Sequence, residues 1–415
     1  MPVTGHRRRI LLPALSLGCA AMLGACSVVS PSTAAKAPSA TTAAASRTST
    51  TASPTTTASA AVVLTASVTA GQADVPVDTL VKVTAQRGTV ADVKMSYRDR
   101  KSGSTVPLQG VLDPAGASWT ASSLLEPGST YALAMTGKDV DGLTATTTSS
   151  FTTQDLSLKQ QIFPTIVGGG VVGVAMPVIV RFDVPVSDRA SIERHLRVTS
   201  SPSQPGTWSW LSNNEVHYRP ASYWRPGTTV KVDVDINSVP AGHGTYGQKS
   251  VTGGFTVARS LVMKADLATD QLSVTIDGKL VRTIPVTGGK AGFLSRSGTK
   301  VIMEKFAKLR MDANTVGIEP GDPNYYNIPD VQYAMRETNS GEFLHAAPWS
   351  VASQGRANVS HGCVGMSTGN AAWLFSQVKV GDPVVVTGTA RTLEPGNGWT
   401  DWNVSYAQYR KGSAL

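Results

Sequence analysis

A turn-and-strand pattern that recurs along the chain constrains its fold more than any other feature. Residues 125–131 (LEPGSTY) and 224–230 (WRPGTTV) share a Pro-Gly turn that leads into an alternating strand. The closing segments also match, with SFTT at 150–153 and GFTV at 254–257. The copies are about 100 residues apart, which is the usual size of an immunoglobulin-like sandwich. The repeat therefore predicts two tandem sandwiches of this kind.

The composition agrees with a mainly β chain. Only 16% of the 415 residues are charged and 39 are glycine, which disfavours coiled coils and helical bundles. We place the sandwiches at 61–154 and 155–257, and one large β domain whose turns coincide is the open alternative. The formal net charge is +9, without stretches of Lys and Arg interleaved with aromatic residues. Nucleic acid is therefore not an expected partner, and a polyanionic envelope is the better match.

The first 60 residues resemble an export signal followed by a tether. Basic residues precede an apolar stretch at 10–23, which is too short to span a bilayer. The stretch ends in Leu-Gly-Ala-Cys, which resembles a bacterial lipobox with Cys26 as the lipidated residue. An ordinary secretory signal with a chance cysteine is the alternative. We predict a lipoprotein signal peptide over 1–26, a disordered Ala/Ser/Thr/Pro linker over 27–60, and an exported protein anchored to the outer face of the cell membrane.

A third β-rich region is expected at 258–390. Apolar residues alternate with polar ones over 272–284, on both sides of Asp277-Gly278. This dipeptide is typical of a two-residue hairpin turn. Residues 384–386 (VVV) predict a buried strand that closes the domain.

Two short helical segments are expected near the C-terminus. Residues 370–378 predict one helix, with Ser367 or Thr368 as its N-cap. The tail at 391–415 carries aromatic residues at helical spacing, and we expect this face to pack on the β-rich domain at 258–390. These aromatic residues are Trp399, Trp402, Tyr406 and Tyr409.

Cys363 is the only thiol expected in the mature protein, because Cys19 leaves with the signal and Cys26 carries lipid. Exported chains usually pair their cysteines, so an unpaired thiol indicates reactivity. Two of the six histidines, His345 and His361, lie close to it in sequence. Imidazole suits the role of a base for a thiol because its pKa lies near neutral pH. The pattern predicts a cysteine nucleophile with a histidine base.

Other chemistries fit these residues less well. Zinc bound by His345, His361 and Cys363 would lack the fourth protein ligand of a closed site, and we expect neither metal nor cofactor. Residues 365–369 match G-x-S-x-G, but that motif needs a later histidine and His361 is the last one. Residues 297–300 match S-x-x-K without the partner K-T-G. A non-catalytic lipoprotein that binds wall glycan would leave the His-Gly-Cys segment unexplained.

The segment Ser360–Val364 (SHGCV), with His345 before it and GDPVVV at 381–386 after it, resembles the YkuD-type L,D-transpeptidases. The lipobox, the paired sandwiches and the Trp-rich tail are similar to mycobacterial and actinobacterial members. The resemblance implies a β-rich YkuD-like catalytic domain. It also implies that Cys363 attacks the third residue of a tetrapeptide stem, expels D-Ala, and passes the acyl group to a neighbouring stem's amine. The product is a 3→3 peptidoglycan cross-link, and an L,D-carboxypeptidase or cysteine peptidase on the same site is the alternative.

The resemblance also assigns roles to residues. His345 is the base, oriented by the carbonyl of Ala346, and His361 lines the site. Gly362 and Cys363 supply backbone donors to an oxyanion, which suits the close approach that glycine permits. Carbapenem-type β-lactams are the expected inhibitors. Residues expected to bind substrate are Met311, Tyr326, Trp349, Asn358 and Ser360.

Two positions depart from the family pattern. Members often carry Arg or Asn two residues after the cysteine, where this chain has Gly365. Many carry Ser, Thr or Gly directly after the first histidine, where this chain has Ala346. The departures bear on substrate preference and leave the nucleophile and base untouched.

Overall fold

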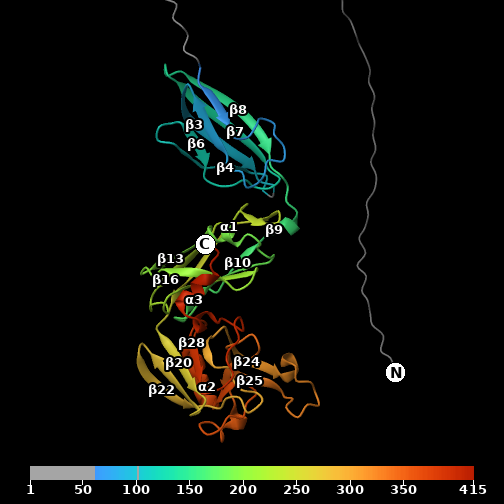
Figure 1. Cartoon of the computed structure of the whole chain (residues 1–415), viewed down its shortest axis with the longest axis vertical. Coiled ribbons are helices and arrows are strands. Elements are labelled where there is room, and N and C mark those ends of the chain that lie inside the picture. The colour runs from blue at the N-terminus through green and yellow to red at the C-terminus, as the bar shows by residue number, and fades with distance from the viewer. Residues whose placement is uncertain (1–60, 101) are drawn as a thin grey trace, which may run out of the picture. The chain divides into compact units, whose positions relative to one another are not determined.

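The computed structural model describes residues 61–100 and 102–415, in which strands predominate (Figure 1). The predicted signal peptide, Cys26 and the linker lie outside the described residues. No helix in the described part of the chain is both long and apolar enough to cross a membrane.

The first group of strands forms two four-stranded sheets around one core. The sheets are β1(Val63–Ala66)-β2(Lys82–Gln86)-β6(Ser118–Ala121)-β5(Gly110–Leu112) and β4(Thr105–Leu108)-β3(Gly88–Arg98)-β7(Thr130–Asp139)-β8(Thr144–Thr152). Strand β7 buries alternate residues, because successive side chains of a strand point to opposite faces. Tyr131 and Leu133 on its inner face pack with Trp119 of β6.

The second group of strands also forms two main sheets, with a separate core. These are β10(Pro164–Val167)-β12(Val178–Phe182)-β15(Glu215–Pro220)-β14(Gly206–Trp210) and β11(Val171–Val172)-β19(Val251–Val257)-β16(Thr229–Val234)-β13(Leu196–Ser201). A small third sheet, β17(Pro240–Gly242)-β18(Thr245–Gly247)-β9(Gln161–Ile162), and two short helices, η1(Leu158–Gln160) and α1(Arg189–Glu193), complete it.

The repeated Pro-Gly turns precede corresponding strands in the two groups. One leads into β7 and the other into β16. Gly128 and Gly227 have φ of 54° and 78°, a conformation that glycine adopts without steric cost. The repeated glycine thus has a conformational reason, while the exact limits of the two sandwiches stay a prediction.

The catalytic region consists of two sheets with one helix between them in the core. The sheets are β22(Lys279–Pro285)-β21(Gln271–Ile276)-β20(Leu261–Asp266)-β28(Pro383–Thr387)-β23(Gly298–Val301) and β24(Glu304–Asp312)-β25(Asn327–Arg336)-β26(Phe343–Ala346)-β27(Val364–Met366). The short turn η2(Ala313–Val316) follows β24. Leu344 and Val364 of one sheet share a core with Val384 of the other and with Leu374 of helix α2(Thr368–Gln377).

Three local predictions are confirmed here. Asp277 and Gly278 join β21 to β22, both with positive φ, as a two-residue turn with this sequence requires. Ser367 is the N-cap of α2, and its side chain accepts a hydrogen bond from the Asn370 amide. Strand β28 contains Val384–Val386 and lies between β20 and β23.

The C-terminal tail differs from the expectation. It is helical as predicted, but in three short pieces, which are η4(Asp401–Asn403), α3(Tyr406–Tyr409) and η5(Arg410–Gly412). Its aromatic face packs partly on the second sandwich, which the prediction did not include, because three of the four rings surround Arg219 of β15. The ring centroids of Trp402, Tyr409 and Tyr406 lie 4.6, 4.4 and 5.5 Å from its guanidinium carbon.

A buried ion pair explains this placement. His217 Nδ1 of β15 lies 2.9 Å from Asp401 Oδ1. Burial opposes a charge on the ring, but Asp401 and Glu215 raise the pKa of His217 to about 9, so it is charged at neutral pH. The tail also contacts the catalytic domain, where Asn403 Oδ1 accepts a hydrogen bond from the Thr299 amide at 2.6 Å. The tail therefore contacts both domains.

Candidate active site

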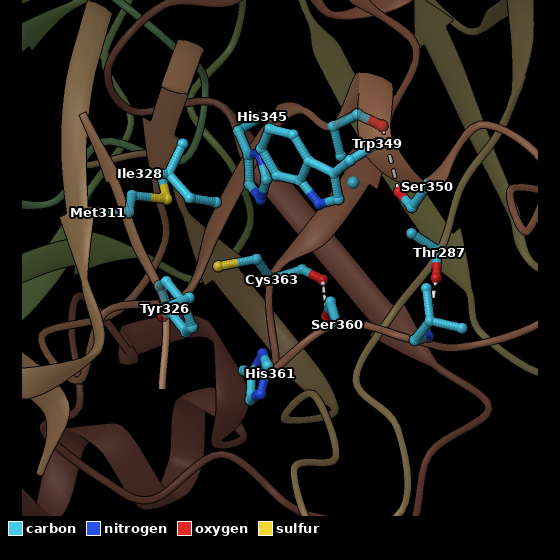
Figure 2. A pocket seen from close by; sticks show the side chains of 13 residues that line it. Thr287, Met311, Tyr326, Ile328, His345, Trp349, Ser350, Ser360, His361 and Cys363 are labelled. Carbon is cyan, nitrogen blue, oxygen red and sulfur yellow. Dashed lines mark hydrogen bonds between the residues drawn. The ribbon is translucent and has the colours of Figure 1, made fainter. Parts of the chain in front are cut away.

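A pocket of about 300 Å³ brings together most of the residues that the sequence singled out. Figure 2 shows Cys363 in the pocket wall, with His345 on one side of it and His361 on the other. The predicted residues that line the pocket are Met311, Tyr326, His345, Trp349, Ser360, His361 and Cys363.

Two adjacent parallel strands place the nucleophile beside the histidine. His345 lies on β26, and Cys363 immediately precedes β27. In the register of this pair, His345 lies opposite Gly365. The connection between the strands must cross over to keep them parallel, and it carries Trp349 and Ser360 to the pocket. The spacing of the motif in the sequence is thus a consequence of one parallel pairing.

The hydrogen bond of His345 determines which ring nitrogen acts as the base. Its Nδ1 lies 2.7 Å from the carbonyl oxygen of Ala346. A carbonyl can only accept, so Nδ1 carries the proton and Nε2 has a free lone pair. Burial lowers the pKa of His345, although the Ala346 contact opposes this. The imidazole is therefore neutral and ready to take a proton through Nε2.

The Cys363 side chain is a thiol at rest rather than a thiolate. Burial raises its pKa to about 12; a backbone contact from Phe343 opposes this shift, and the charge of Glu342 adds to it. Its Sγ lies 3.7 Å from the Gly341 carbonyl oxygen, which accepts the S–H. The sequence suggested a base that holds a thiolate. The structure instead has a neutral thiol and a neutral imidazole in the lining of one pocket.

His361 forms part of the wall between two aromatic rings. Its ring centroid lies 4.8 Å from that of Phe293 and 5.0 Å from that of Tyr326. Burial lowers its pKa, and the charge of Lys290 adds to this effect. Its Nε2 is buried without a hydrogen-bond partner among the described residues. These contacts fit the prediction that His361 lines the site.

The backbone donors differ from the expectation at one position. The Gly362 amide donates to Ser360 Oγ at 3.1 Å, and this hydroxyl donates to the Cys363 carbonyl at 2.6 Å. The Gly362 amide is therefore engaged rather than free to bind an oxyanion. Within the described residues no hydrogen bond engages the Cys363 amide. Ser360 therefore stabilises the loop through its hydroxyl group and also lines the pocket.

Asn358 does not line the pocket, in contrast to the prediction. Its Oδ1 accepts a hydrogen bond from the Gly288 amide at 2.5 Å, and its Nδ2 donates to the Leu267 carbonyl at 2.8 Å. Both ends of the amide are used to tie the catalytic loop to the neighbouring sheet. Its role is thus to position the loop rather than to contact substrate.

Further lining residues carried no signal in the sequence. Thr287 is the clearest case, since its hydroxyl donates to the Ala357 carbonyl at 2.8 Å and accepts from the Val359 amide at 3.0 Å. Only the pairing of distant segments brings it to the pocket. The other unpredicted lining residues are Ile328, Ala347, Ser350 and Val359. Gly365, which departs from the family pattern in the sequence, also lines the pocket.

A second cavity, of about 540 Å³, also reaches the nucleophile. It shares Met311, Tyr326, His361 and Cys363 with the first pocket. Its remaining lining is more polar and includes Arg296. The thiol can therefore be approached through two cavities.

Comparison with known proteins is consistent with this site. Residues 261–386 match the family model of the L,D-transpeptidase catalytic domain, and residues 72–240 match that of a bacterial Ig domain. The chain is 37% identical over 354 residues to L,D-transpeptidase 2 of Mycobacterium tuberculosis, covering 85% of each chain. The chain belongs to the L,D-transpeptidase family. As an L,D-transpeptidase it is an acyltransferase, and its mainly β fold, Ig-like region, catalytic domain and short C-terminal helices agree with the predictions.

Other L,D-transpeptidases match over part of the chain. L,D-transpeptidase 1 of Mycobacterium tuberculosis is 39% identical over 220 residues, which cover 53% of this chain and 82% of the relative. A solved L,D-transpeptidase in complex with imipenem is 37% identical, with a TM-score of 0.47, and covers 54% of this chain and 97% of that chain.

Proposed function

We propose that this L,D-transpeptidase forms 3→3 cross-links in peptidoglycan through a thioester on Cys363. The thiol attacks the carbonyl carbon of the third residue of a donor tetrapeptide while His345 Nε2 takes its proton. The bond to D-Ala breaks, and His345 returns that proton to the departing amine. The side-chain amine of an acceptor stem then attacks the thioester, giving up a proton to His345 as the thiol leaves and is reprotonated.

One observation carries this proposal: a neutral thiol and a neutral imidazole with a free Nε2 line the same pocket. General base assistance in this form needs an unprotonated imidazole, which burial of His345 provides. The second cavity supports transfer to an amine over hydrolysis, since an acceptor held there would be concentrated at the thioester.

The proposal is tested by supplying disaccharide-tetrapeptide as both donor and acceptor. We expect the purified protein to release D-Ala and to accumulate a cross-linked dimer, measured by mass spectrometry. Full D-Ala release without dimer at any donor concentration would instead identify an L,D-carboxypeptidase. Neither product, with a folded protein that still binds wall glycan, would favour the non-catalytic alternative.

A thiol that forms an acyl-enzyme should also be acylated by β-lactams of the carbapenem type. The strained amide carbonyl takes the place of the stem carbonyl, and no amine leaves, so the adduct persists. We expect intact mass to show one adduct per chain, on the peptide that contains Cys363. An adduct on Ser297 or Ser367 would contradict a cysteine nucleophile.

We also propose that a lipid on Cys26 anchors the enzyme to the outer face of the cell membrane. The support is the lipobox-like sequence before this residue and the exported nature of the proposed substrate. Cys26→Ala is expected to move the protein from the membrane fraction to the soluble fraction with its activity in solution intact. Unchanged fractionation would rule out attachment at this residue.

A further inference from the structure

A cluster of buried charges lies next to the Cys363 loop and takes no part in the steps above. Lys300, Glu337 and Glu342 are only 1%, 1% and 3% exposed. Lys300 Nζ lies 3.1 Å from Glu337 Oε2 and 2.6 Å from Glu342 Oε2. Arg296 Nη1 lies 2.9 Å from Glu342 Oε1. Buried ion clusters contribute little to stability once desolvation is counted, so this charge cluster calls for another role.

Two residues that adjoin the charge cluster in the sequence, Gly341 and Ser295, form hydrogen bonds with the Cys363 loop. The Gly341 carbonyl oxygen accepts from Cys363 Sγ at 3.7 Å. Ser295 Oγ donates to the Gly362 carbonyl at 2.7 Å. Glu342 directly follows Gly341 in the sequence, and Arg296 directly follows Ser295. Glu342 and Arg296 form an ion pair with each other. The ion pair therefore ties together the two segments that contact the loop from different sides.

The charges of the cluster also act on the thiol. A Cβ built on Gly362 would lie 3.4 Å from Glu342 Oε1, so this carboxylate packs directly against the loop. The charges of Glu342 and Glu337 add to the effect of burial in raising the pKa of Cys363, whereas that of Lys300 lowers it. The cluster thus exerts opposing electrostatic effects on the same sulfur.

The other titratable groups that line the first pocket, His345, His361 and Tyr326, carry no charge at neutral pH. Burial lowers the pKa of His345 and of His361, and it raises the pKa of Tyr326 to about 12. The arginines of the second cavity other than Arg296 are each paired with a carboxylate. The charged residues of that cavity are Arg296, Arg310, Asp312, Arg336, Glu342 and Arg391.

We propose that the charge cluster of Arg296, Lys300, Glu337 and Glu342 is a positioning unit for the nucleophile. It holds the Cys363 loop in place, and its opposing charges set how readily the thiol gives its proton to His345. The inference rests on the proposed nucleophilic role of Cys363, but it concerns a property of the thiol that can be measured without turnover.

The test is the rate at which iodoacetamide alkylates Cys363 in the full chain between pH 7 and 10, quantified on the Cys363 peptide by mass spectrometry. Only the thiolate reacts, so the rate at fixed pH follows the fraction of thiolate. Glu342→Gln removes a negative charge and leaves Lys300 paired with Glu337. We expect roughly threefold faster alkylation, which corresponds to a decrease of about half a unit in the pKa of Cys363. Lys300→Met should slow alkylation by a similar factor.

The expected increase in alkylation rate for Glu342→Gln and decrease for Lys300→Met distinguish an electrostatic role from a purely structural one. Loss of fold or loosening of the loop would change both rates in the same direction, whereas loss of opposite charges changes them in opposite directions. A matched control is Glu193→Gln, which alters a carboxylate of the second sandwich that is also 3% exposed. It should leave the alkylation rate unchanged.

Lys300→Met leaves two buried carboxylates without their shared cation, so a second variant guards against its failure to fold. Lys300→Met/Glu337→Gln removes one charge of each sign and leaves Glu342 paired with Arg296. Its alkylation rate should lie near that of the unaltered protein and below that of Glu342→Gln. Equal rates in all folded variants, or changes of one sign, would overturn the proposal. Turnover that survives without Cys363 would instead refute the proposed function and leave the alkylation result standing.

Discussion

Replacing Cys363 with alanine is expected to abolish both D-Ala release and dimer formation. Both products pass through the same thioester, and the methyl group of alanine cannot form one. Loss of a covalent nucleophile costs roughly 10⁴-fold or more in rate, which places both products below detection. The measurement is mass spectrometry of stem-peptide products after incubation with disaccharide-tetrapeptide.

A matched control distinguishes the thiol from nearby hydroxyls. Ser367 lies in the accidental G-x-S-x-G match, and its side chain caps α2. Ser367→Ala should cost about 1 kcal/mol of stability through the lost cap but keep full activity in the folded protein. Persistent activity of Cys363→Ala together with loss in Ser367→Ala would reverse the assignment of the nucleophile.

Replacing His345 with alanine is expected to slow formation of the acyl-enzyme by ~10²–10⁴-fold, the usual contribution of a general base. The effect should be large because the thiol itself is unfavourable to ionise, with its pKa raised to about 12 by burial. The rate is measured as single-turnover D-Ala release or carbapenem acylation. Alkylation of Cys363 at high pH should persist, which shows that the nucleophile is intact. His361→Ala should cost less, since His361 lines the wall.

The pH dependence of acylation follows from the same burial. The base must be neutral, so the rate falls when the pH drops through the pKa of His345 in the folded protein. Because burial lowers this pKa below its usual 6.5, the acylation rate at pH 6.5 should be more than half of its maximum, whereas a base with the pKa of an exposed histidine would give half. A midpoint at or above 6.5 would contradict a buried neutral base.

Local chemistry accounts for the features that could be read from the sequence. The hairpin at Asp277-Gly278 follows from the positive φ that a two-residue turn demands. The cap of α2 follows from a serine hydroxyl near unpaired amides. Cys363 and His345 could be singled out together because an unpaired thiol nucleophile needs a base, and the family resemblance named the same two residues.

The sequence could not show contacts that depend on distant segments. The contact of the aromatic tail with the second sandwich was missed because His217 and Arg219, which bind it, belong to a strand far earlier in the chain. Thr287 was missed and Asn358 was wrongly expected to contact substrate, because their hydrogen bonds join the catalytic loop to other parts of the domain. Spacing and periodicity describe one element at a time and carry no information about such pairings.

The sequence by itself therefore determined the mainly β class, the repeated Pro-Gly turns, the unpaired thiol and the histidine that serves it. Only the tertiary structure decided that the thiol rests protonated, that Ser360 engages the Gly362 amide, and that buried charges lie next to the Cys363 loop. The physical reason is that ionisation depends on burial and on charges brought near by folding. Residue types and their spacing specify which groups are present, whereas packing specifies the state in which they act.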